Sequence, residues 1–195
     1  EYPRVNYNGV GSLYAYGAQF EQQSFATSYI PTIGEVNGVT RLADAASGAG
    51  SSDLINSTSG VFYAEIAALD SVGSDREITI SDGTTDNRVM ITYSSNNIRV
   101  NYRANSVNIF DRTFNTTITD YNKIALKWKL NDFSFYVNGT EISTSTIGSV
   151  LPPNTLNTLN YDDGSSGFPF FGKTKCVAVF KEALTDAELT CLTTI

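Results

Sequence analysis

The chain has 195 residues, of which 41% are hydrophobic and 17% charged, so it can bury a sizeable core and is not a disordered chain. Its 13 basic and 20 acidic residues give a net charge of −7, which argues against nucleic acid as the main partner. It contains no histidine, which excludes Ser-His-Asp catalysis, Cys-His catalysis and His-based metal sites, and no apolar stretch approaches the ~20 residues needed for membrane insertion.

Residues 1–50 differ from the rest of the chain. The segments VGSLYAYGAQFEQ and VTRLAD each predict a strand, and Pro31 favours an extended conformation at Ile30 between them. The small, polar run AASGAGSSD then predicts a flexible loop. We expect residues 1–23 to be a connector from an upstream region and residues 24–195 to form the domain.

Short segments of alternating hydrophobicity follow, separated by turn residues, and this pattern is typical of antiparallel strands. Two of the connections, SNN before Ile98 and the Asn138–Gly139 pair, predict tight hairpins because Asn and Gly tolerate positive φ angles. The predicted strands span residues 60–69, 76–81, 88–94, 98–104, 123–130, 133–137 and 175–180.

The segment 123–130 shows the alternation most clearly. Large apolar residues stand at every second position from Ile124 to Leu130, and we expect them to face the core. Lys123, Lys127 and Lys129 occupy the other face, which we expect to be accessible to solvent.

One helix is predicted at the C-terminal end, in ALTDAELTCLTTI. Thr185 is its expected N-cap, with Glu188 three residues later as a capping box. We expect the side formed by Leu184, Ala187, Cys191 and Ile195 to lie against a sheet. For Cys176 and Cys191, two interpretations stay open: two buried small hydrophobic residues, or one bridge that fastens the helix to the last strand.

Many short strands, regular turns and one short helix predict an all-β fold of two antiparallel sheets packed face to face. The segment NKIALKWKLNDFSFYVNGTEI resembles the central hairpin of laminin-G-like, concanavalin A-like jelly-roll domains. GVFYAEIAAL resembles the inner strand of such domains, and FFGKTKCVAVFKEALTDAELTCL resembles their closing strand and helix. The resemblance covers residues 50–195 and implies a two-sheet antiparallel jelly-roll sandwich with one short C-terminal helix.

The N-terminal phrase YGAQFEQQSFATSYIPT, followed by VTRLAD, resembles a linker found in phage tail fibre proteins and bacterial surface proteins. The combined resemblance implies a non-catalytic module that binds a cell-surface glycan, polysaccharide or receptor, located in a virion tail fibre or at a cell surface. It also implies a homo-oligomer, for example a trimer. A purely structural or oligomerising virion domain and a polysaccharide hydrolase are the alternatives.

A hydrolase would need two carboxylates on either side of the scissile bond. The nearest pair in one segment is Glu65 and Asp70, which are five residues apart and therefore point to opposite faces of a regular strand. We therefore expect no catalytic residues, although pairs drawn from separate strands stay open.

Polar side chains on the outward face of the predicted strands form the candidate ligand site. If these strands are neighbours in one sheet, tyrosines can stack on sugar rings while Arg, Lys and Asn bind hydroxyls or carboxylates, which predicts an anionic polysaccharide as ligand. The competing interpretation is a solvated sheet face. The predicted ligand-binding residues, on this face or at the loop rim, are Tyr63, Arg88, Arg99, Asn101, Arg103, Lys127, Tyr136 and Tyr161.

The loop NYDDGSSGFPFFG contains the candidate metal ligands Asp162 and Asp163. Calcium prefers carboxylate and carbonyl oxygens, and the laminin-G resemblance implies that one calcium ion can bind at a sheet rim. The loop fits no defined calcium-binding spacing, and ordinary turn chemistry explains the DDG sequence equally directly.

Overall fold

The computed structural model describes residues 49–195 together with Gly9 and Tyr29. The chain divides into two compact units, Glu1–Ala43 and Asp44–Ile195, and every strand and helix described here belongs to the second unit. The predicted connector of residues 1–23, the strands predicted before residue 45 and the predicted domain boundary at residue 24 lie outside the described residues and stay predictions.

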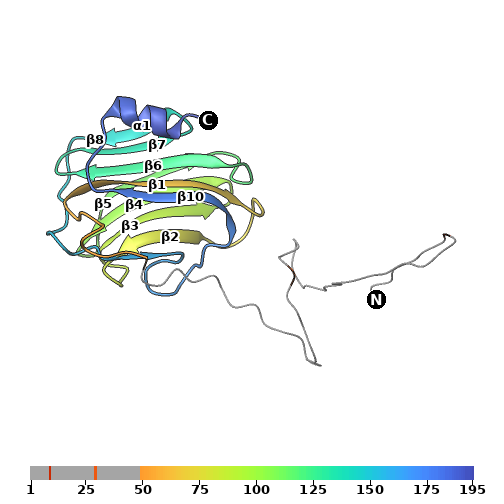
Figure 1. Cartoon of the computed structure of the whole chain (residues 1–195), viewed down its shortest axis with the longest axis horizontal. Helices are drawn as coiled ribbons and strands as arrows, with labels where there is room; N and C mark the ends of the chain where they lie inside the picture. The colour runs from red at the N-terminus through yellow and green to blue at the C-terminus, as the bar shows by residue number, and fades with distance from the viewer. Residues whose placement is uncertain (1–8, 10–28, 30–48) are drawn as a thin grey trace, which may run out of the picture. The chain divides into compact units, whose positions relative to one another are not determined.

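The described elements form two five-stranded antiparallel sheets and one short helix (Figure 1). The first sheet has the strand order β10-β1-β6-β7-β8, and the second sheet has the order β5-β4-β3-β2-β9. This arrangement confirms the predicted sandwich. The bounds are β1 Ser59–Ala68, β2 Arg76–Ser81, β3 Arg88–Ser94, β4 Asn97–Ala104, β5 Val107–Asn115, β6 Asn122–Lys129, β7 Phe133–Val137, β8 Thr140–Ser145, β9 Thr158–Asn160, β10 Gly172–Phe180 and α1 Asp186–Thr193.

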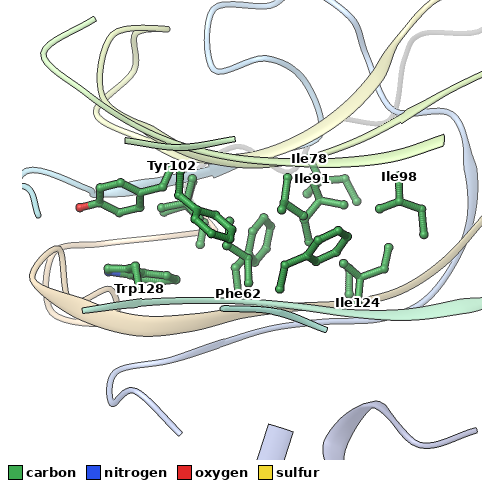
Figure 2. Close-up of a cluster of buried hydrophobic side chains, with 14 of the residues drawn as sticks. Phe62, Ile78, Ile91, Ile98, Tyr102, Ile124 and Trp128 are labelled. Atoms are coloured by element: carbon green, nitrogen blue, oxygen red, sulfur yellow. The ribbon is translucent and has the colours of Figure 1, made fainter. Parts of the chain in front are cut away.

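The core lies between the two sheets, where every second side chain of the inner strands is buried (Figure 2). Phe62, Ile124 and Trp128 project from the first sheet toward Ile91 and Tyr102 of the second. Burial of each such side chain contributes about 1.5–3 kcal/mol relative to exposure. The alternation from Ile124 to Trp128 is therefore confirmed as the inner face of β6.

The prediction that Leu130 faces the core is wrong, because its side chain is 60% exposed. β6 ends at Lys129, and Asn131 in the following turn has a φ angle of 57°. The turn therefore begins before the alternation reaches Leu130, so this residue no longer follows the two-residue period of the strand.

The predicted hairpin turns are present. Ser95 and Asn96 have φ angles of 46° and 60° between β3 and β4, and Asn138 and Gly139 have φ angles of 51° and 80° between β7 and β8. Two consecutive residues with positive φ match the right-handed twist of the flanking strands, so these turns fix the register of both hairpins.

Apart from β8, which the Asn138–Gly139 hairpin implies without bounds, two strands were not predicted from the sequence. β5 is an edge strand with a register shift opposite Tyr102 and Arg103, and this irregularity interrupts its alternation of buried and exposed residues. β9 has only three residues and pairs along β2. Neither segment carries the regular pattern on which the sequence interpretation depends.

Helix α1 has the predicted capping box, in which Thr185 and Glu188 bond reciprocally. The predicted packing side is wrong for three of its four residues, because Ala187 and Cys191 are exposed and Ile195 is 82% exposed beyond the end of the helix. Leu189 is buried instead, and the predicted contact of Leu184 with the sheet is confirmed.

Both interpretations of the cysteines are wrong, since Cys176 and Cys191 are free and exposed. Cys176 lies on the edge strand β10, whose residues 173–176 are exposed, and Cys191 lies on the solvent side of α1. Among the described residues, no helix has the length and apolar character required to cross a membrane.

Candidate functional site

The residues predicted to bind a ligand divide between the two sheets. The sheets pack together through their inner faces, so their outer faces point away from each other (Figure 2). The two sets therefore cannot form one platform. Tyr63, Lys127 and Tyr136 lie on the first sheet, and Arg88, Arg99, Asn101 and Arg103 lie on the second.

Helix α1 covers the outer face of the first sheet, packing on β6, β7 and β8. Tyr63 and Tyr136 are buried there in a cluster with Leu189, and burial raises the pKa of Tyr63 to about 12. The Tyr136 hydroxyl donates to Glu141 Oε2 at 2.8 Å. These tyrosines support the helix rather than offering an accessible stacking surface, which corrects their assignment to a ligand site.

Lys127 points outward from β6 as predicted, but the helix buries it. Its Nζ atom lies 2.8 Å from Asp132 Oδ1 and 3.4 Å from Asp186 Oδ1, so its charge is paired within the protein. Lys123 Nζ donates to the backbone oxygen of Thr194 at 2.7 Å, just beyond the helix. The expectation of an accessible lysine row is therefore wrong for Lys127, because the sequence pattern of β6 does not show what covers the strand.

Tyr161 lies directly after β9 and packs against the core, with its ring centroid 6.2 Å from that of Phe170. Phe170 is itself buried, while Phe168 and Phe171 are exposed. The structure therefore places Tyr161 at the closed end of the sandwich and not among the outward side chains of the second sheet.

The outer face of the second sheet gathers the remaining predicted residues. We define the arginine face as the outward side chains of β2, β3, β4 and β5. The cross-strand register arranges them in three rows: Glu77, Thr92, Arg99 and Thr113; then Thr79, Met90, Asn101 and Asp111; then Ser81, Arg88, Arg103 and Asn108.

The arginines of this face differ in how they are paired. Arg99 binds Asp111 with two hydrogen bonds, from Nε to Oδ1 at 2.8 Å and from Nη2 to Oδ2 at 2.6 Å. Arg88 Nη1 lies 3.4 Å from Glu77 Oε2. Burial raises the pKa of Glu77, although the nearby guanidinium of Arg88 opposes this shift. The face is thus polar, with local charge of both signs.

Several buried polar atoms of the arginine face have no hydrogen-bond partner. Within the described part of the chain, they are Thr79 Oγ1, Thr92 Oγ1, Arg88 Nε and Arg103 Nε, and only Arg76 Nε and Ser134 Oγ share this property elsewhere. An unsatisfied buried polar group costs about 1–3 kcal/mol, so native proteins retain few of them. The threonines of this face are buried, and the predicted ligand residue Asn101 is also only 1% exposed, which corrects its expected accessibility. The side chains of Arg88, Arg99 and Arg103 are partly exposed and are the groups of this face that a ligand can reach.

The loop after β9 borders this face. The Asp163 backbone oxygen accepts from Arg88 Nη1 at 2.9 Å. Gly164 has a φ angle of +91°, and a Cβ atom there would lie 2.9 Å from Ser81 Oγ, so only glycine allows the loop to approach β2 this closely. The loop therefore positions its backbone against the row that contains Arg88.

The carboxylates predicted to bind a metal hold this loop together. Asp162 Oδ1 accepts from the Gly164 amide at 2.7 Å. Asp163 Oδ1 accepts from the Ser165 amide at 2.8 Å, the Ser165 hydroxyl at 3.0 Å and the Gly167 amide at 2.8 Å. Burial raises the pKa of Asp163, but these hydrogen bonds outweigh it and lower the pKa below its ordinary value.

No group of three or more Asp, Glu, Cys or His side chains with metal-binding geometry occurs among residues 49–195. The donor set around Asp162 and Asp163 consists of turn contacts, which supports the turn interpretation of the DDG sequence. A calcium ion at this loop stays a prediction.

Comparison with known families finds a match over residues 66–190 to the model described as the concanavalin A-like lectin/glucanases superfamily. A comparison with curated proteins finds no significant match.

Among solved structures, the chain resembles the CBM40 domain of the Ruminococcus gnavus IT-sialidase bound to α2,6 sialyllactose, with 15% identity and a TM-score of 0.58 over 75% of this chain and 93% of that chain. The same domain bound to α2,3 sialyllactose has 16% identity and a TM-score of 0.57 over 70% of this chain and 83% of that chain. A leech intramolecular trans-sialidase has 20% identity and a TM-score of 0.54 over 71% of this chain but only 24% of that chain. At these identities, the likeness shows a shared fold.

Proposed function

Because the chain belongs to the concanavalin A-like lectin/glucanases superfamily, we propose that it is a non-catalytic glycan-binding module with its site on the arginine face. The observation that carries this proposal is the group of three partly exposed arginines, Arg88, Arg99 and Arg103, on the outer side of β3 and β4. Saccharides present many oxygen atoms that accept hydrogen bonds, so they suit a surface of arginine donors.

The structural neighbours support the ligand class. The CBM40 domains of Ruminococcus gnavus are bound to sialyllactose in their structures, which shows that a fold of this type accommodates a saccharide. At an identity of 15–16%, the position of the site has to be argued from the residues of this chain and not from those of the neighbours.

Two carboxylates of the arginine face lie too far apart to act as a pair in glycoside hydrolysis. Glu77 and Asp111 belong to β2 and β5, which β3 and β4 separate. Three strand spacings place the two backbones about 14 Å apart, whereas glycoside hydrolases need carboxyl groups at about 5–9.5 Å. Glu65 and Asp70 are engaged separately, by Lys175 at 2.9 Å and Arg76 at 2.6 Å.

The biological setting that the N-terminal phrase implies remains part of the proposal. We propose that the module is part of a phage tail fibre or a similar surface protein and that it functions as a homo-oligomer. A shallow sheet face binds each saccharide weakly, and several copies on one particle would raise the useful strength through avidity.

A glycan array probed with the full chain, clustered on a multivalent support, tests this function. We expect binding to at least one glycan, and we expect Arg99→Ala combined with Arg103→Ala, which changes two partly exposed side chains, to reduce the signal at least fivefold. Lys129→Ala on the first sheet is the matched control and should retain binding, since its exposed side chain lies on the opposite side of the sandwich. Absence of binding to any glycan would favour the structural alternative.

A further inference from the structure

Arg88 on β3 and Arg103 on β4 are direct cross-strand partners on the arginine face. Like charges directly opposite each other destabilise an antiparallel pair. The like-charge pair therefore lowers the stability of the folded protein without ligand, and a bound anion would offset the repulsion.

The partners within the protein differ between the two arginines. Arg88 lies 3.4 Å from the carboxylate of Glu77, donates to the Asp163 backbone oxygen at 2.9 Å and interacts electrostatically with the Asp163 carboxylate. Arg103 donates through Nη2 only to the uncharged Ser106 backbone oxygen, at 3.2 Å. Arg103 forms no ion pair with any residue of the described part of the chain. Arg99, on the same face, shows the contrast, because Asp111 binds its guanidinium bidentately.

Both arginines also keep an unused donor that is removed from water. Their Nε atoms are buried and have no hydrogen-bond partner. A guanidinium group offers its donors in a planar fork that matches the two oxygens of a carboxylate or of a sulfate. Two such forks on adjacent strands, about 5 Å apart, can converge on one anionic group.

The hydroxyl beside this pair is already engaged within the protein. Ser81, the cross-strand neighbour of Arg88 on β2, is fully buried, and its Oγ atom accepts from the Gly83 amide at 3.1 Å and lies 3.2 Å from Thr158 Oγ1 of β9. The partly exposed guanidinium groups are therefore what this part of the face offers to a ligand. Nucleic acid fits less well, because the face combines its arginines with Glu77 and Asp111 and the chain carries a net charge of −7.

We propose that the Arg88–Arg103 pair binds the carboxylate or sulfate group of an acidic saccharide. This inference rests on the proposed glycan-binding function and names the ligand class of that same site.

Matched pairs of oligosaccharides test the inference with the full chain. The pairs are a uronic acid oligosaccharide with its carboxyl-reduced form, a sialylated oligosaccharide with its desialylated form, and a sulfated oligosaccharide with its desulfated form. We expect the acidic member of at least one pair to bind about tenfold more tightly than its neutral partner, since charge-assisted hydrogen bonds are roughly twice as strong as neutral ones. The carboxylate and sulfate arms identify which anion the pair accepts.

Variants at Arg103 test whether this residue causes the preference for the acidic oligosaccharide. Arg103→Gln should abolish the preference for the acidic member, and Arg103→Lys should retain part of it because the charge remains without the fork. Lys129→Gln removes one positive charge from the opposite sheet and should leave the preference unchanged. Equal binding of acidic and neutral members, or an acid preference that survives Arg103→Gln, would overturn the inference while the glycan-binding function stands. Absence of binding in every pair would overturn both.

The melting temperature of the unliganded chain separates a ligand role from a folding role. Arg103→Gln removes a like-charge contact and should melt at or above the wild-type temperature at low salt. A decrease of more than about 4 °C would show that Arg103 supports the fold, and that result would contradict the inference.

Discussion

Glu77 is a buried carboxylate of the arginine face, and its charge is coupled to groups from several elements. Burial is the largest influence and raises the pKa of Glu77, Arg88 and Arg99 lower it, and Asp163 and Asp75 raise it. The proton-bound form is therefore favoured in the folded protein relative to the unfolded chain.

This shift predicts a pH dependence of folding stability. Between the ordinary value of 4.5 and the raised pKa, the folded protein binds the Glu77 proton more tightly, so stability rises as the pH falls through that window. Urea unfolding from pH 7 to pH 4.5 should show the free energy of unfolding of the wild type rising relative to that of Glu77→Gln. A parallel pH profile for the two proteins would refute the assignment.

The carboxylate of Asp163 changes folding stability with pH in the opposite direction to Glu77, and it does so at lower pH. Its lowered pKa means that its stabilisation is present above the ordinary value of 3.8 and is lost as the pH falls through the folded value. Asp163→Ala removes three hydrogen bonds within the loop and should lower the free energy of unfolding by about 1–3 kcal/mol near neutral pH. Asp162→Ala, which removes one such bond, is the control and should have the smaller effect in urea unfolding. Equal losses for both variants would contradict this account of the loop.

Helix α1 covers the outer face of the first sheet and packs on β6, β7 and β8. Leu189 is fully buried beneath the helix, next to Val61 and Tyr63 of β1. Leu189→Ala should lower the free energy of unfolding by about 2–5 kcal/mol because it leaves a cavity there.

The companion variant Cys191→Ala changes an exposed residue of the same helix and should stay within about 0.5 kcal/mol of the wild type in chemical denaturation. Under conditions in which Leu189→Ala is still folded, its affinity for glycan should be unchanged, since the helix packs on the sheet opposite the proposed site. A coupled loss of affinity would indicate that the site lies near α1.

The sequence predicted the elements whose local chemistry is unambiguous. The Asn138–Gly139 turn and the Thr185 capping box each depend on residues within four positions of one another, so they could be identified without knowledge of the fold. The burial of Lys127 depends on α1, about sixty positions away, and no pattern within β6 reveals that contact. The irregular edge strand β5 was missed for the related reason that its register is set by β4.

The two outer faces of the sandwich differ in what their side chains contact. The first sheet uses its outward tyrosines and Lys127 to hold α1, while the second sheet leaves arginines and threonines with unused hydrogen-bonding atoms. The sequence predicted the side chains of both faces correctly as outward. Their division between two sheets depends on the strand order, which alternation alone does not contain.

Arginine side-chain NMR distinguishes a glycan bound to the outer side of the second sheet from one bound elsewhere on the protein. In ¹H–¹⁵N spectra of the full chain titrated with its strongest-binding glycan, the Nε–H signals of Arg88 and Arg103 should shift with saturation, because these donors are unpaired in the free protein. The signal of Arg112 on β5, whose Nε already donates to Ser143 Oγ at 2.9 Å, should remain in place. Shifts confined to amides of α1, β6 and β7, with the Arg88 and Arg103 signals unmoved, would contradict the account.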